Sequence, residues 1–267
     1  MTAVTTTPPP RLPVRDKAEA RDRAWGGVSP MLTRLAAERA TGVLVRERGT
    51  LHLAEGRVVH AESPEAPGLG ELLTARGTLD ADTWHQAVAQ AQGVTGAALL
   101  LAERNLLTRG ELELSHLEAL YDAAYFALSP SSSPGRFRYV GAEEAPGVHP
   151  VAVAALEHET LRRRDLLHRV WPDPASDHAP LHRASSLGAP SLTARQRAVL
   201  DRVDGVRAAP DIARAIGRPA FHTLVDVRRL AAAGLVTCGA PRPVTPPQST
   251  DPDITLLKRL RDALESL

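Results

Sequence analysis

Alternating apolar and polar residues mark the segment from Ala40 to Ala61. Its apolar side chains recur at every second position, and histidines and charged residues stand between them: Val43, Val45, Leu51, Leu53, Val59 and Ala61 form the apolar set. A period of two is typical of half-buried β-strands. Gly49 and Gly56 follow polar residues, and glycine tolerates the positive φ angles of tight reversals. The pattern therefore predicts three short antiparallel strands.

A short amphipathic helix is predicted just before these strands. Ser29 is placed to cap it, and Pro30 suits its first turn because that position needs no amide donor. Leu32 and Leu35 lie on the face that would pack on the sheet. Residues 1–28 carry Thr and Pro runs followed by mixed charges, which predicts a disordered tail.

A segment that begins at Leu69 is repeated at an offset of 28 residues. Gly77 and Asn105, the residue types that best tolerate the left-handed conformation, occupy equivalent positions after the first helix of each copy. Asp80 and Thr108 then fall at equivalent N-caps. Each copy is predicted to be a helix, a tight turn and a second helix. This pattern resembles the helical N-terminal domain of type II secretion ATPases, which is an interaction module.

The second copy continues into a long predicted helix that carries Tyr121 and Tyr125 at helical spacing. Core packing is the expected role of these tyrosines, and a ligand site is the alternative. Residues 136–140 alternate as a strand that could return to the edge of the sheet. A further helix is predicted over 151–170, where Arg162–Arg164 are expected to be solvated, with an anion or partner contact as the alternative.

The order of these elements resembles the PATAN domain, a bacterial regulatory module. The runs EGRVVHA (55–61) and LGELL (69–73) carry the resemblance, which covers roughly residues 30–165. It implies a protein-interaction domain without enzymatic activity, of the kind found beside receiver domains or in small-GTPase systems. The alternative is an unrelated sheet whose spacing of glycines and hydrophobic residues matches that of the PATAN domain by chance. We assign residues 29–170 to this α+β domain.

Residues 171–190 are rich in Pro, Ser, Asp and His and are predicted to be a linker. His178 and His182 have the i, i+4 spacing of metal ligands on a helix. Pro180 lies between them and argues against that helix, so no metal is expected there.

The pattern of residues 191–240 changes to three helices and a strand. Thr193 or Ser191 is placed to cap the first helix, Gly217 ends the second, and the third covers residues 219–233. The order resembles the winged-helix module of bacterial transcription regulators, which implies DNA binding through the third helix.

The local charge of this module permits contacts with phosphate. Between Arg195 and Arg229 there are eight arginines and four aspartates, a net charge of +4. The candidate DNA-binding residues are Arg214, Arg218, His222, Arg228 and Arg229. Asp226 lies on the same outward line and would face a polyanion, so a module retained for dimerisation or partner docking is an equal alternative.

A second Pro-rich linker, residues 241–252, precedes an amphipathic segment at residues 253–267. Its apolar stripe is the candidate partner-binding surface: Ile254, Leu257, Leu260 and Leu264. The spacing is heptad-like, but two heptads are too few for an autonomous coiled coil. The segment is expected to pack on the body of the protein or on another chain.

Composition narrows the function further. The net charge of +1 gives no global basic field, and one cysteine, Cys238, excludes an internal disulfide. No Gly-rich phosphate loop, nucleophile elbow or His-Glu-x-x-His run is present, so neither an enzyme nor a cofactor is expected. We expect a cytoplasmic, non-enzymatic regulatory protein of α+β fold. A transcriptional regulator is slightly favoured, and a protein–protein adaptor in a signalling or small-GTPase system is the alternative.

Overall fold

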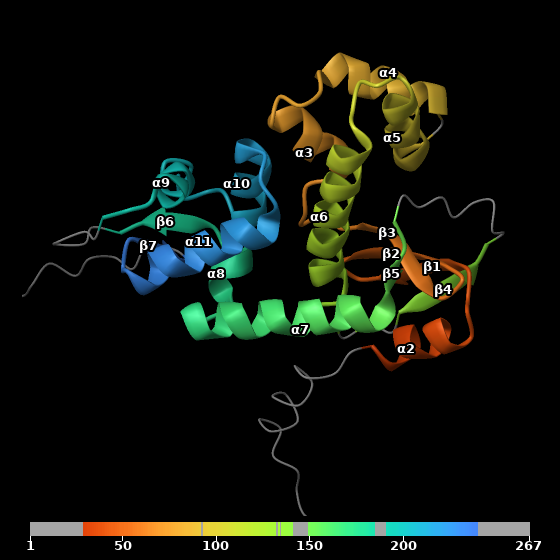
Figure 1. Cartoon of the computed structure of the whole chain (residues 1–267). Coiled ribbons are helices and arrows are strands. Elements are labelled where there is room, and N and C mark those ends of the chain that lie inside the picture. The colour runs from red at the N-terminus through yellow and green to blue at the C-terminus, as the bar shows by residue number, and fades with distance from the viewer. Residues whose placement is uncertain are drawn as a thin grey trace, which may run out of the picture.

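The computed structural model describes residues 29–91, 93–131, 133, 135–140, 149–184 and 191–239. The fold is α+β, as predicted. Helix α7 lies along the base of the molecule and joins the sheet with α2 at one end to the C-terminal elements at the other, while α6 rises from the sheet to α3, α4 and α5 (Figure 1). The predicted tail at 1–28 and the predicted elements at 241–267 lie outside the described residues.

The three predicted strands form the centre of an antiparallel sheet with the order β4-β1-β2-β3-β5. The strands are β1 (Gly42–Arg46), β2 (Gly49–Ala54), β3 (Arg57–Glu62), β4 (Arg136–Tyr139) and β5 (Val151–Ala152). Glu55 and Gly56 reverse the chain between β2 and β3 with φ angles of 48° and 74°. The predicted return strand, β4, pairs with β1 at one edge.

One face of the sheet packs on helices. The side chains of Leu44, Leu51, Leu53 and Val58 are 0% exposed, and they pack in one core with α2 (Pro30–Ala37) and the C-terminal half of α6 (Arg109–Ala127). In β2 the predicted residues Leu51 and Leu53 are thus on the buried face, as the period of two requires. In β1 the predicted face is wrong: Leu44 is buried there, whereas Val45 is 47% exposed.

The repeat is confirmed in its hydrogen bonds. Its helices are α3 (Leu69–Ala75), α4 (Ala81–Ala91), α5 (Val94–Glu103) and α6. The Thr78 amide donates to the Leu73 carbonyl at 3.1 Å, and 28 residues later the Leu106 amide donates to the Leu101 carbonyl at 3.0 Å. Gly77 and Asn105 have φ angles of 70° and 56°. The two copies share a second hydrophobic core.

Helix α7 (Val153–Val170) covers most of the helix predicted over 151–170. The elements after it begin earlier than predicted, and they are α8 (Ala175–His178), β6 (Leu181–Arg183), α9 (Ala194–Leu200), α10 (Ala209–Ile216), α11 (Ala220–Ala232) and β7 (Val236–Cys238). Residues 171–184 are therefore not a linker. Strand β6 pairs antiparallel with β7, and Leu181 is 0% exposed. We call residues 175–184 and 191–239 the C-terminal module.

The C-terminal module does not have a core of its own. Val199, Ile212, Leu224 and Leu230 belong to the same cluster of buried side chains as the apolar face of the sheet. The boundary predicted near residue 190 therefore does not separate two cores, because α6 and α7 pack both on the sheet domain and on α11 of the C-terminal module. No helix within the described ranges is long and apolar enough to cross a membrane.

Candidate functional site

The helix expected to read DNA, α11, is mostly buried. Nine of its 13 residues are buried, and it packs against α9 and α10 on one side and α6, α7 and α8 on the other. Phe221 contacts the ring of Tyr125 with a centroid separation of 5.5 Å, and the Arg163 guanidinium lies 4.6 Å above the Phe221 ring. The residues of α11 that are exposed are His222, Arg229 and Ala232.

Arg228 holds α11 to the segment that follows α7. It is 2% exposed, and its Nε and Nη2 atoms donate to the two carboxylate oxygens of Asp177 at 2.8 and 2.6 Å. Its Nη1 atom donates to the Trp171 carbonyl at 2.5 Å. Arg228 was a candidate for DNA contact, but its guanidinium is turned into the protein and lies in a buried bidentate ion pair rather than on the outer surface of α11.

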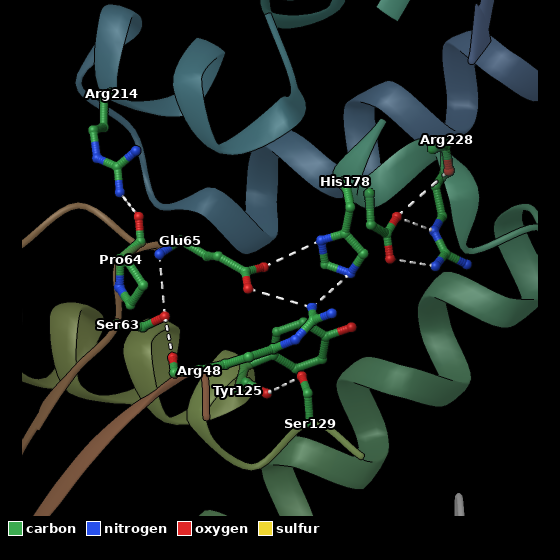
Figure 2. Close-up of polar contacts among 11 residues, drawn as sticks. Arg48, Ser63, Pro64, Glu65, Tyr125, Ser129, His178, Arg214 and Arg228 are labelled. Atoms are coloured by element: carbon green, nitrogen blue, oxygen red, sulfur yellow. Dashed lines mark hydrogen bonds and ion pairs between the residues drawn. The ribbon is translucent and has the colours of Figure 1, made fainter. Parts of the chain in front are cut away.

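The other four candidates do not form one basic surface. The Arg218 guanidinium lies 3.2 Å from the Asp226 carboxylate, and Arg229 lies 4.0 Å from the same carboxylate. Arg214, on α10, donates to the Pro64 carbonyl and turns toward the loop after β3, as Figure 2 shows. Of the five candidates, His222 and Arg229 are exposed. Asp226 thus neutralises charge on the line where phosphate was expected.

A second contact ties the N-terminus of α11 to α6. The Asp122 carboxylate is 0% exposed and accepts the backbone amides of Ala220 at 2.5 Å and Phe221 at 2.8 Å. These amides begin α11 and have no partner inside the helix, so Asp122 caps it from another part of the chain. Burial raises the pKa of Asp122 to about 6, while the two amides and Arg163 favour the carboxylate.

A third contact joins the sheet to the C-terminal module. The Arg48 Nη1 atom lies 2.9 Å from His178 Nε2 and 3.3 Å from a Glu65 oxygen, and His178 Nδ1 lies 3.2 Å from the other Glu65 oxygen (Figure 2). His178 and Arg48 together lower the pKa of Glu65, although burial opposes them. The turn after β1, the loop after β3 and α8 are thus held by one cluster.

His178 ends α8 and His182 lies in β6, so the two histidines do not share a helix. Within the described ranges, no three His, Cys, Asp or Glu residues are placed to hold a metal ion. His52 and His60 on the sheet and His116 on α6 form a row of rings. The ring centroids of His52 and His60 are 5.4 Å apart, and those of His60 and His116 are 6.2 Å apart. Burial lowers the pKa of His116 to about 4, which keeps its ring neutral.

Two cavities flank these contacts. One, of about 350 Å³, lies between β3, α3, α6 and α10, and its lining is mainly apolar, with Trp84, Leu69 and Ala123 on its walls. The other, of about 120 Å³, lies at the junction cluster and is lined by Arg48, Arg164 and Arg228. The expectation that Arg162–Arg164 are solvated holds for Arg162, whose side chain is 55% exposed. It is wrong for Arg163, whose side chain is 12% exposed, and for Arg164, which is 7% exposed.

Sequence reasoning missed four side chains that hold these elements together. Asp122 joins α6 to α11, Asp177 joins α8 to α11, and Arg48 and Glu65 join the sheet and the loop after β3 to α8. The candidate partner-binding stripe, Ile254, Leu257, Leu260 and Leu264, lies outside the described residues. In comparisons with known proteins, the chain matches no protein-family model, and no curated protein or solved structure is significantly similar to it.

Proposed function

We propose that this chain is a non-enzymatic adaptor that binds other proteins, and that its C-terminal module does not read DNA. The observation that carries the proposal is the burial of α11. A recognition helix must offer a line of side chains that reaches base edges in the major groove. The exposed line of α11 is short, and the Asp226 carboxylate lies between His222 and Arg229.

The alternative, a transcriptional regulator, would need α11 to leave its place. That movement would expose Phe221 and Leu224 and would separate the Arg228–Asp177 pair. Leaving one buried charge without its partner costs about 3–5 kcal/mol. The electrostatic attraction between a few exposed arginines and DNA does not offset the lost apolar burial and the lost ion pair. We therefore favour a module that packs on the rest of the protein over one that binds DNA.

The surface through which we expect the adaptor to bind is the apolar stripe of residues 253–267. Ile254, Leu257, Leu260 and Leu264 recur at helical spacing, and charged residues stand between them. Two heptads need a partner surface to become helical. A bacterial signalling or small-GTPase system in the cytoplasm is the setting that the PATAN resemblance suggests.

The first arm of the test measures binding of the full-length protein to random duplex DNA across a salt series. The expected result is no salt-sensitive binding, even at low ionic strength, where the phosphate contribution is largest. His222→Ala with Arg229→Ala is the companion variant, because both side chains are exposed. Salt-dependent binding that this double variant loses would support the regulator instead.

The second arm measures recovery of a partner by the full-length chain. Leu257→Glu with Leu260→Glu places two charges on the stripe and is expected to abolish recovery. Thr255→Glu with Ser266→Glu adds the same charge beside the stripe and is the matched control, expected to leave recovery unchanged. Equal recovery by both variants would remove the stripe from the proposal.

A further inference from the structure

The smaller cavity at the junction has an unusual lining for its size. It measures about 120 Å³, roughly the room of four water molecules. Three arginines line it, Arg48, Arg164 and Arg228, together with the side chain of Tyr125, and Asp177 is the carboxylate on its wall. These residues come from the turn after β1, from α6, α7 and α8, and from α11.

The guanidinium groups are held in fixed positions. Arg228 is fixed by Asp177 and the Trp171 carbonyl, and Arg164 donates to the Leu128 carbonyl at 2.6 Å. Arg48 is placed by Glu65 and His178 on the opposite side, as Figure 2 shows. Donors that are already ordered lose little entropy when they bind a ligand.

One polar group on the wall makes no hydrogen bond with the described part of the chain. It is the hydroxyl of Tyr125, a residue that is 8% exposed. Arg46 does not line the cavity itself, but its Nη2 atom donates to the carbonyl of Ser129, which does, at 3.3 Å. Burial and the positive charge of Arg46 both lower the pKa of Arg164. The Tyr125 hydroxyl is therefore available to a ligand in the cavity.

We propose that this cavity binds a tetrahedral oxyanion of the phosphate class, either inorganic phosphate or the phosphoryl group of a small monoester. A guanidinium carries five N–H donors, so Arg48 and Arg228 can keep their carboxylate partners and still offer a donor to a phosphate oxygen. The Tyr125 hydroxyl supplies a neutral donor on the same wall. The volume admits one phosphoryl group and excludes a nucleotide, whose sugar and base would lie outside.

The bound anion contacts every part of the junction at once. Arg48 belongs to the sheet, Tyr125 to α6, and Arg228 to the C-terminal module. Occupancy therefore strengthens the attachment of the module to the sheet, and the ligand raises the stability of the whole chain by mass action. This site is independent of the proposed adaptor function, because it does not use residues 253–267.

The test is titration calorimetry of the full-length protein with inorganic phosphate, methyl phosphate and acetate, at constant ionic strength in a buffer without other oxyanions. Tyr125→Phe is the principal variant, since it removes a hydroxyl that makes no hydrogen bond with the described residues and keeps the buried ring. It is expected to weaken phosphate binding about fivefold, the effect of one neutral hydrogen bond. Arg48→Gln is expected to weaken it about tenfold or more.

Arg109→Gln is the matched control, because its side chain is 88% exposed and lies far from the junction on the first turn of α6. Saturable binding of phosphate or methyl phosphate that Tyr125→Phe weakens and Arg109→Gln does not would support the proposal. Tighter binding of one of the two then identifies the source as the free ion or a monoester. No saturable binding of either, equal binding by Tyr125→Phe, or equal binding of acetate would overturn it.

Discussion

Replacing Arg228 with alanine is expected to lower the free energy of unfolding by about 3–5 kcal/mol, because Asp177 would keep a buried charge without a partner. Both side chains are nearly inaccessible, at 3% and 7% exposure, and two hydrogen bonds join them. The Trp171 carbonyl would also lose its donor. Urea unfolding of the full-length protein, followed by circular dichroism, measures the loss.

Arg229→Ala is the matched control for this prediction. Arg229 is the next residue in α11, its side chain is 54% exposed, and its contact with Asp226 is long at 4.0 Å. The expected change is within about 0.5 kcal/mol. Arg228→Met combined with Asp177→Ala removes both charges and is expected to regain part of the loss. An Arg228→Ala variant as stable as Arg229→Ala would contradict the buried pair.

Asp122→Ala is expected to cost about 3 kcal/mol of unfolding free energy, because the amides of Ala220 and Phe221 would lose a charged acceptor. The change would also free the N-terminus of α11 from α6. The packing of Tyr125 and Phe221 would then change, and the near-ultraviolet circular dichroism of the protein should change with it. Thermal or urea unfolding measures the cost.

Asp122→Asn keeps the shape of the side chain and removes its charge, so it shows how much of the loss comes from the charge. The amide oxygen can accept one of the two backbone amides, while its NH₂ group would face the other, so an intermediate loss is expected. Glu113→Ala on the same helix is the control, since Glu113 pairs with the exposed Arg109 at 3.3 Å, and a change below about 0.5 kcal/mol is expected. Losses of equal size at Asp122 and Glu113 would contradict the cap.

Local patterns in the sequence predicted the elements that depend on local chemistry. The strands of the sheet followed from their period of two, and Gly56 has the positive φ angle that its turn requires. The repeat was visible because Gly77 and Asn105 stop equivalent helices in the same way. Each of these features is fixed by residues close together in the chain.

The linker prediction failed because β6 is only three residues long and its partner strand lies far along the chain. Leu181–Arg183 pairs with Val236–Cys238, and no local pattern in a Pro- and His-rich segment signals such a distant partner. A three-residue strand carries too little alternation to be detected. The boundary of the C-terminal module was therefore placed too late.

The burial of Arg228 was missed for a related reason. An arginine on a helix is usually exposed. Arg228 is buried because it pairs with Asp177, which is 51 residues away in the chain, and no local pattern indicates that pairing. Signals were nonetheless present. Val225, Val227 and Leu230 spread over an arc too wide for a helix with one covered face. Arg164 falls on the stripe that contains Leu156 and Leu167, at helical spacing, so its burial could have been predicted.

The measurement that tests the central claim most directly is hydrogen exchange of the full-length protein, with peptides that cover α11 and α6. If α11 is part of the shared core, its amides exchange as slowly as those in the C-terminal half of α6, within about 1 kcal/mol of opening free energy. Exchange of α11 that is far faster than that of α6 would show that the C-terminal module opens by itself, and would contradict the account.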